Sequence, residues 1–260
     1  MKDIESRDLF IFRALRGSRL HGTNVEGSDY DYFDVYLNDM GYYLSTRSLE
    51  PMKNRTFSRK FSEENDLLQH EFIKFITLLK KGNPNCIEFL FNEEWVECHQ
   101  IWKDMQAIRE EFLSKAIITA CVGMARSDMK NVDKYGERGS YYYNSIFSFR
   151  KAREILKYRK INIKRDGIDK EYLQAVKQMN LTEAISLLAT DFEANETFGA
   201  GLSSVTGGIN SFRDLFQFEK SVFEIYEEKY GDTLKDIPDS GLIDKKVSDI
   251  LFNHFKNTGE

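Results

Sequence analysis

The feature that most constrains the fold of this chain is a change in its apolar pattern near residue 100. Before that point, short apolar runs alternate with turn-rich segments, and the aromatic and β-branched runs Leu9–Leu15 and Tyr32–Leu37 predict β-strands. Beyond it, apolar residues recur at helical spacing along nearly all of the chain. This order predicts an α+β protein in which a small part with strands and helices precedes a C-terminal helical bundle.

Helical spacing also locates the individual helices. In Phe72–Lys80 the apolar positions i, i+3, i+4 and i+7 form one face, and Gly82 ends that helix. Asn83 in the capping position and Pro84 in the first turn predict the start of the next helix. Beyond residue 100 the predicted helices are Ile101–Gly123, Tyr141–Tyr158, Glu171–Met179, Thr182–Phe192, Phe212–Tyr230 and Ile243–Phe255. We therefore predict two domains, residues 1–100 and residues 101–260.

Composition excludes several classes of protein. An aromatic content of 13% is too high for a disordered chain, and three cysteines without CxxC spacing argue against both a disulfide framework and a zinc site. With a net charge of −5, any contact with nucleic acid requires a local basic patch. The chain has neither an apolar run of the roughly 18 residues that span a bilayer nor a secretory h-region, which predicts a cytoplasmic protein without a membrane partner. The oligomeric state stays open.

The segment between the two predicted strands concentrates the chemistry. Gly17 and Ser18 follow the first strand and offer an uncrowded backbone and a hydroxyl donor, which suit phosphate oxygens. Asp29 and Asp31 stand two residues apart at the start of the second strand, where alternation points both carboxylates to one face. Such close like charges require cations, and Mg²⁺ or Mn²⁺ prefers oxygen ligands. A D-x-D pair alone is also common in solvated turns, but its coupling to Gly-Ser favours a metal–nucleotide site.

The segment GSRLHGTNVEGSDYDYFDVY, residues 17–36, resembles the G-S-x-x-x-G…S-D-x-D signature of the DNA polymerase β nucleotidyltransferase superfamily. Within it, the chain is most similar to a bacterial and phage family of predicted nucleotidyltransferases, some of them linked to RNA repair. The resemblance continues in DLLQHEFIKF (66–75), KGNPNCIEFL (81–90) and FLSK (112–115), and covers roughly residues 8–160. It implies a polymerase β-like mixed sheet with helices, followed by helices that assist nucleotide and acceptor binding.

The resemblance also implies an activity and its residues. An NMP would pass from an NTP to the hydroxyl of an RNA or tRNA end, or of a protein, with release of pyrophosphate. The catalytic residues, which would also hold two Mg²⁺ or Mn²⁺ ions, are Asp29, Asp31 and Asp66, with Glu63, Glu64 and Glu71 as alternatives to Asp66. The predicted nucleotide-binding residues are Gly17, Ser18, Arg19, Lys115 and Arg150. The family's histidine-bearing helix corresponds to YNSIFSFR (143–150), which keeps the arginine but lacks the histidines.

A basic segment suggests where an acceptor binds. Residues 150–165 contain eight basic residues and one acidic residue, Glu154, and lie close to the tyrosines at 141–143. Cations next to aromatic rings are typical of surfaces that bind single-stranded nucleic acid, which predicts RNA or tRNA as a partner. Two other interpretations are a solvated helix face and, for Arg150, a contact with the triphosphate.

Two alternative functions differ in class. A D-x-D glycosyltransferase would need a nucleotide-binding unit of roughly 100 residues before the motif, whereas the motif here begins at residue 29. The other alternative is a catalytically weak nucleotide- or RNA-binding module of the same fold. Intact Gly17-Ser18 and three candidate carboxylates argue against it.

Overall fold

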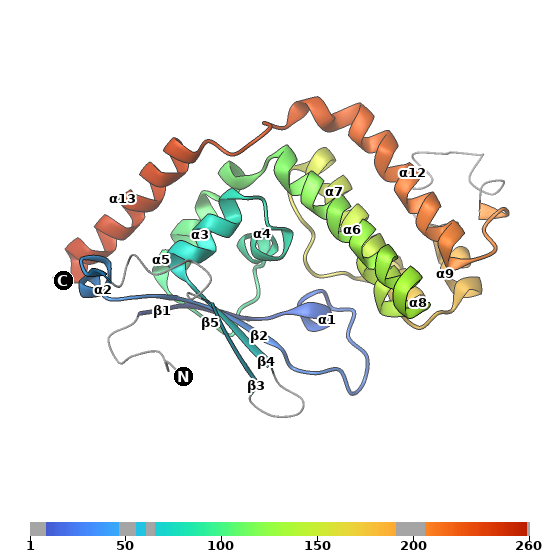
Figure 1. Cartoon of the computed structure of the whole chain (residues 1–260), viewed down its shortest axis with the longest axis horizontal. Helices are drawn as coiled ribbons and strands as arrows, with labels where there is room; N and C mark the ends of the chain where they lie inside the picture. Colours follow the sequence, from blue (N-terminus) through green and yellow to red (C-terminus); the bar gives the residue numbers. More distant parts are fainter. Residues whose placement is uncertain (1–8, 47–55, 61–65, 191–205, 259–260) are drawn as a thin grey trace. The chain divides into compact units, whose positions relative to one another are not determined.

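A five-stranded mixed sheet organises the first part of the chain (Figure 1). The structure, a computed structural model, describes residues 9–46, 56–60, 66–190 and 206–258. The strands are β1 (Leu9–Leu15), β2 (Tyr32–Leu37), β3 (Thr56–Lys60), β4 (Asp66–Glu71) and β5 (Glu97–Cys98). Their order is β3-β4-β2-β1-β5, in which β2 and β4 run parallel and the other neighbours are antiparallel. The two predicted strands are confirmed, and three others join them.

Helices cover one face of this sheet (Figure 1). They are α3 (Phe72–Lys80), α4 (Pro84–Phe91) and α5 (Gln100–Ala107). Stacked aromatic rings join them to the strands: Phe33 of β2 lies 4.2 Å from Phe89 of α4, and Phe12 of β1 lies 3.8 Å from Trp102 of α5. As predicted, the Asn83 side chain caps α4, accepting a hydrogen bond from the backbone N–H of Cys86 at 3.1 Å. Large buried rings of this kind supply much of a core's hydrophobic stabilisation.

The chain forms two compact units, and their bounds differ from the predicted division at residue 100. The first unit comprises residues 1–112 together with 237–260, and the second comprises residues 113–236. The last helix, α13 (Ser240–Thr258), therefore belongs with the sheet. Ion pairs from Asp244 to Lys80 at 2.8 Å and from Lys246 to Glu111 at 2.5 Å attach it there. These partners are distant in sequence, so helical periodicity alone could not show the return of the chain.

The prediction of a single helix over Ile101–Gly123 is wrong, because the helix is interrupted where the first unit ends and the second begins. Helix α5 ends at Ala107, a 3₁₀ turn covers Arg109–Phe112, and α6 begins at Lys115. Ser114 has extended backbone angles (φ −158°, ψ 169°), which interrupt the helix. Phe112 is fully buried beside this break. The apolar periodicity continues across the interruption, because α5 and α6 both bury apolar residues.

The second unit is helical, as predicted. Its helices are α6 (Lys115–Tyr135), α7 (Gly139–Tyr158), α8 (Gly167–Lys177), α9 (Leu181–Leu188) and α12 (Phe212–Tyr230). Helix α7 is buried on most of its surface, and its Phe149 lies 5.5 Å from Phe216 and 5.4 Å from Phe223 of α12, between ring centroids. The break between α8 and α9 falls at Asn180, whose side chain caps α9. The unit is thus built around α7.

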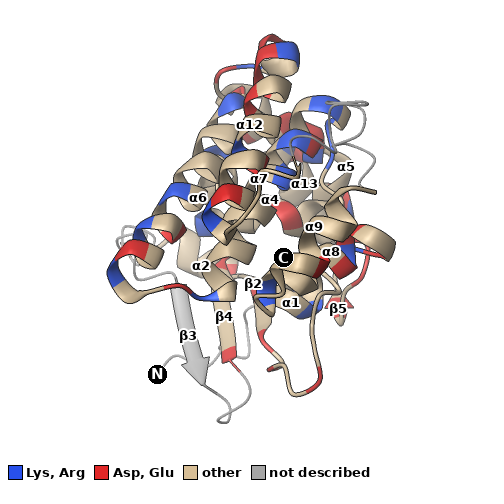
Figure 2. Ribbon diagram, turned by 90° about the vertical axis from the view of Figure 1, so that its right-hand side faces the viewer, with Lys and Arg blue, Asp and Glu red and all other residues tan. Residues whose placement is uncertain are grey.

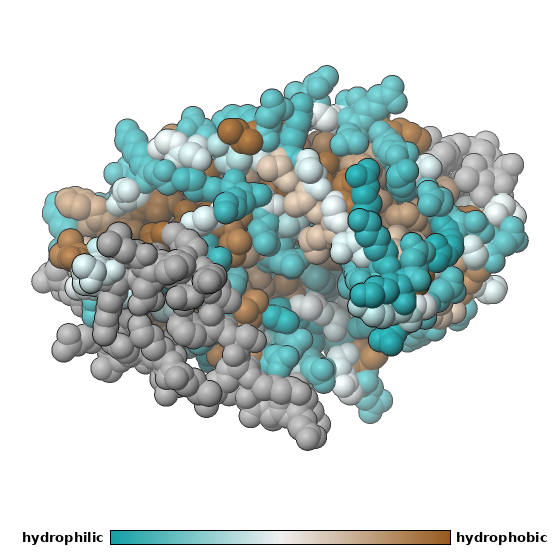
Figure 3. All heavy atoms as spheres, in the orientation of Figure 1, coloured by the Kyte–Doolittle hydropathy of each residue, from teal (hydrophilic) through white to brown (hydrophobic). Residues whose placement is uncertain are grey.

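Charged residues of both signs are interspersed along the helices in Figure 2. The face drawn in Figure 3 is mostly hydrophilic where residues are described, with scattered apolar positions. Among the described residues, no helix combines the length and the apolar character that crossing a membrane requires.

Candidate active site

The Gly-Ser turn follows β1 directly and touches the acidic segment. Gly17 has a φ of +63°, a left-handed conformation that favours glycine, and begins the single helical turn α1 (Gly17–Leu20). A Cβ atom on Gly17 would lie 4.0 Å from Oδ2 of Asp31. Just before it, the backbone N–H of Arg16 donates to the carbonyl oxygen of Asp31 at 2.9 Å. The predicted phosphate turn and one predicted metal ligand are therefore neighbours.

Asp29 and Asp31 lie just before β2 rather than on it, since the strand begins at Tyr32. The alternation argument for a shared strand face therefore does not apply to both residues. Asp29 is exposed and Asp31 is partly exposed, with Nε of Arg16 at 4.0 Å from its carboxylate. Both residues thus belong to the loop before β2, and Asp31 is the one whose carboxylate adjoins Gly17.

Asp66 is the first residue of β4, at the end of that strand where its ladder with β2 begins. Strands β2 and β4 are parallel, and Tyr32 pairs with Leu67 at the start of the ladder. Asp31 and Asp66 directly precede these two residues in the sequence. The predicted ligands Asp31 and Asp66 therefore belong to the same end of the two strands.

The alternatives to Asp66 divide into two groups. Glu63 and Glu64 lie outside the described residues. Glu71 is fully buried at the opposite end of β4, where it caps α3 by accepting from the N–H groups of Ile73 and Lys74. It also accepts a hydrogen bond from the Tyr43 hydroxyl at 2.5 Å. Glu71 is therefore a structural carboxylate, and its role as the third metal ligand is excluded by its position.

The donor set suits a hard cation, although it is not assembled as a closed cage. Within residues 9–46, 66–190 and 206–258, no three His, Cys, Asp or Glu side chains lie close enough together to hold one ion. Asp31 and Asp66 directly precede the first pair of the β2–β4 ladder, and Asp29 belongs to the loop before β2. Oxygen donors of this kind fit Mg²⁺ or Mn²⁺, which keep several waters or substrate oxygens as ligands.

Asp34 is a nearby carboxylate that the sequence did not single out. It is fully buried on β2 and accepts two hydrogen bonds from Arg13, at 2.8 and 2.7 Å, and one from Gln69, at 3.1 Å. The hydrogen bond from Arg13 to Asp34 raises the pKa of Arg13. Arg13, Asp34 and Gln69 are register partners on three adjacent strands. The sequence signal for this carboxylate was Arg13 itself, because an arginine within an otherwise apolar strand indicates a buried acidic partner.

Two further side chains hold the turn in place. His21 follows α1, and its Nε2 lies 3.3 Å from Glu88 of α4, with both residues buried. Arg19, predicted to bind nucleotide, directs Nε and Nη2 at the backbone carbonyl oxygens of Asp29 and Ser28. The turn is therefore attached both to α4 and to the acidic segment.

Lys115 and Arg150, the other predicted nucleotide-binding residues, belong to the second unit. Nζ of Lys115 lies 3.2 Å from Asp236 and 3.8 Å from Asp232. Arg150 is only 5% exposed, and its guanidinium donates to Glu219 at 2.8 and 3.1 Å and also to Asp169. Both cations have carboxylate partners within their own unit, and their contact with nucleotide remains a prediction.

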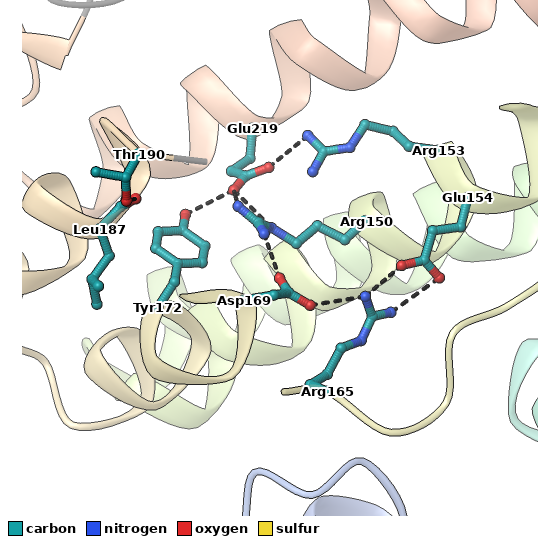
Figure 4. Close-up of polar contacts among 9 residues, drawn as sticks. All are labelled: Arg150, Arg153, Glu154, Arg165, Asp169, Tyr172, Leu187, Thr190 and Glu219. Atoms are coloured by element: carbon teal, nitrogen blue, oxygen red, sulfur yellow. Dashed lines mark hydrogen bonds and ion pairs between the residues drawn. The ribbon is translucent and has the colours of Figure 1, made fainter. Parts of the chain in front are cut away.

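Arg150 is part of a buried cluster of charges, which Figure 4 shows between α7, α8 and α12. The cluster joins the cations Arg150, Arg153 and Arg165 to the carboxylates Glu154, Asp169 and Glu219. Tyr172 adds a hydrogen bond to Glu219 at 2.8 Å. Burial alone would raise the pKa of Asp169, but Arg150 and Arg165 outweigh burial and hold that pKa below its usual value. Three cations thus face three anions.

The basic segment 150–165, through which we predict an RNA or tRNA contact, divides into two halves. The buried half comprises Arg150, Lys151, Arg153 and Arg165. The surface half comprises Lys157, Arg159, Lys160 and Lys164, which are partly or fully exposed. The exposed ring of Tyr158 lies beside the second set, with Nζ of Lys157 4.8 Å from its centroid. Only the surface half is exposed to solvent.

Comparison with known proteins gives one match. A family model described as "RNA repair pathway DNA polymerase beta family" matches residues 2–202, which is more than three quarters of the chain. Neither the curated proteins nor the solved structures contain a match. The matched residues include the Gly-Ser turn, all three candidate carboxylates and the basic segment.

Proposed function

The chain belongs to the RNA repair pathway DNA polymerase beta family, and on that premise we propose that it is a metal-dependent nucleotidyltransferase. The proposed reaction moves a nucleoside monophosphate from a nucleoside triphosphate to a hydroxyl group of an RNA end. One observation carries the proposal: Asp31 adjoins Gly17, and Asp31 and Asp66 directly precede the first pair of the β2–β4 ladder. This placement supports a phosphate-binding turn next to metal-binding carboxylates, which nucleotidyl transfer would require.

Asp29, Asp31 and Asp66 are the residues that would hold two Mg²⁺ or Mn²⁺ ions. When bound, such ions activate the entering hydroxyl and stabilise the leaving pyrophosphate in an in-line displacement. The exposed or partly exposed position of all three carboxylates supports this role, because substrate oxygens must reach the same ions.

The remaining groups of the chain have separate tasks in this proposal. The turn at Gly17 leaves its backbone accessible to phosphate oxygens, and the Ser18 hydroxyl donates a hydrogen bond to them. Asp66 accepts the proton of the attacking hydroxyl. The acceptor oxygen forms a bond to the α-phosphorus while the bond from that phosphorus to the bridging oxygen breaks, and the electron pair leaves with pyrophosphate.

RNA as the acceptor is supported by two facts. The family is described by a role in RNA repair. In addition, the surface half of the basic segment contains four cations and the exposed Tyr158, whose ring lies beside Lys157. Cations that follow a phosphate backbone and a ring that stacks on bases are typical of single-strand binding.

The test uses purified protein with each of the four NTPs labelled at the α-phosphate, Mg²⁺ and RNA. We expect label in the RNA, and we expect Asp29→Ala and Asp31→Ala each to reduce it more than about 100-fold, beyond the typical loss from changes outside the direct ligands. Glu26→Ala is the matched control, because Glu26 is an exposed carboxylate in the same loop. It should transfer label normally.

Two results would contradict the proposal. One is undiminished transfer by folded Asp29→Ala or Asp31→Ala protein. The other is the absence of any labelled product with RNA, protein or small-molecule acceptors from a cell extract. Label in protein instead of RNA would keep the transferase activity and replace the acceptor.

A further inference from the structure

We infer that Arg19 is a positioning residue that fixes the acidic segment Ser28–Asp31 against the Gly-Ser turn. This role rests on the proposed function, because it concerns the same carboxylates. It differs from the direct nucleotide contact that the sequence predicts for Arg19. The distinction lies in what the guanidinium touches.

The guanidinium of Arg19 contacts three consecutive residues of the segment. Its Nε donates to the carbonyl oxygen of Asp29 at 2.9 Å, and its Nη2 donates to that of Ser28 at 2.5 Å. Its central carbon lies 3.4 Å from the centroid of the Tyr30 ring. Two donors in a rigid fork and a flat cation on a ring are features that lysine cannot reproduce together.

The segment needs this attachment because it lies outside the sheet. The ladder between β1 and β2 ends at the pair of Leu15 and Tyr32, so no strand pairing fixes the backbone of Ser28–Tyr30. The Arg16 N–H holds the carbonyl oxygen of Asp31, and Arg19 holds the two carbonyl oxygens before Tyr30. Residues on either side of the Gly-Ser turn therefore hold both ends of the acidic segment.

Charge gives a second reason. Asp29 and Asp31 repel one another, and a cation held next to their backbone offsets part of that repulsion before a metal binds. Because Arg19 binds carbonyl oxygens rather than carboxylate oxygens, it leaves the carboxylates available to a metal. The same arrangement joins the phosphate turn to the metal ligands, so that the two move as one body.

The test measures Mn²⁺ binding to nucleotide-free protein by electron paramagnetic resonance, which does not depend on turnover. We expect Arg19→Lys to weaken Mn²⁺ binding by about 10- to 100-fold, the usual loss when a group that orients metal ligands is changed. Tyr30→Ala should weaken it less, and Tyr30→Phe should restore it because the ring is kept. Arg126→Lys, at an exposed arginine of α6, is the matched control and should bind Mn²⁺ normally.

A direct nucleotide contact gives a different result. In that case Arg19→Lys would keep Mn²⁺ affinity and raise only the KM for NTP, which would overturn the positioning role. If Arg19→Lys fails to fold, the Tyr30 pair decides: equal Mn²⁺ affinity in Tyr30→Ala and Tyr30→Phe would overturn it as well. If the unchanged protein binds no Mn²⁺, the metal-dependent function itself fails, and this inference fails with it.

Discussion

The charged side chains singled out in the two units differ in their burial and in their pairing. In the second unit, Arg150, Arg153 and Arg165 are at most 5% exposed, and carboxylates surround them at hydrogen-bond distance. In the first unit, Asp29 is exposed and Asp31 is partly exposed, and the guanidinium of Arg16 comes no nearer to Asp31 than 4.0 Å. One cluster is neutralised within the protein, whereas the other carboxylates are the ones that we propose to bind an external cation.

Burial separates the two sets of charges. Burying a charge without a partner costs several kcal/mol, so the buried arginines of the second unit need their carboxylates if the unit is to stay folded. Carboxylates beside an accessible glycine turn pay little desolvation and can exchange water for metal and phosphate oxygens. The surroundings of an aspartate, and not the unit to which it belongs, determine whether it is paired. Asp34 lies in the first unit, but it is buried and hydrogen-bonded to Arg13 and Gln69.

The largest expected effect concerns the buried cluster. Glu219→Ala would leave Arg150 and Arg153 without the carboxylate they share, and should lower the free energy of unfolding by about 3–5 kcal/mol. Urea unfolding of the full chain measures this. Glu224→Ala, which removes an exposed glutamate from the same helix, should cost less than about 1 kcal/mol. Equal losses of unfolding free energy in the two variants would show that the buried carboxylate stabilises the protein no more than the exposed one.

A somewhat smaller effect is expected at the sheet edge, in activity rather than stability. Asp66→Asn keeps the size of the side chain but removes a proton acceptor and a charged ligand, so turnover should fall by about 100-fold or more. Because the described residues form no ion pair with Asp66, the midpoint of thermal unfolding should not fall. Asp34→Asn should do the reverse and lower that midpoint, because it weakens a buried pair with Arg13. If the Asp66→Asn protein is destabilised and its turnover is normal, Asp66 has a structural role and no catalytic one.

Local sequence patterns were sufficient for the elements whose residues alternate or repeat clearly. Strands β1 and β2 and helices α3 and α12 have the predicted bounds, because their apolar positions match a single period. Strand β4 was missed, since Asp66, Gln69, His70 and Glu71 make it look like a polar loop. Gln69 and Glu71 have partners on β2 and in α2 (Met40–Tyr43), which no local pattern can show.

The candidate site was predictable only in part for the same reason. The Gly-Ser turn and the D-x-D pair are close in sequence, so their spacing identified them. That Asp66 and Asp31 belong to the same end of their strands depends on the parallel pairing of β2 and β4. Arg150 and Arg153 pair with Glu219, which lies 69 and 66 residues further along the chain. Long-range partners decide which charges are buried, and composition cannot reveal them.

The smallest expected effect concerns the surface half of the basic segment. It tests whether these exposed cations bind an external partner, as we propose for Asp29 and Asp31, or have a structural role like the buried cluster. The positions chosen are Lys160 and Lys164, which are both exposed. If they contact phosphates, Lys160→Glu with Lys164→Glu should weaken RNA binding by about 10-fold or more. It should also reduce the slope of log affinity against log salt by about 2, one for each lost phosphate contact.

NTP affinity and urea unfolding should change little in this double variant, because Lys160 and Lys164 lie outside the buried cluster. The matched control is Arg126→Glu with Lys130→Glu, which alters net charge equally at two exposed positions of α6. If both double variants weaken RNA binding to the same degree, the effect is one of overall charge and the segment has no special role. If RNA binding is insensitive to salt and to both variants, the surface half is an ordinary solvated face, and the acceptor is held through other residues. A loss confined to Lys160 and Lys164, with the reduced salt slope, would show that pairing within the protein separates the structural cations of this segment from the functional ones.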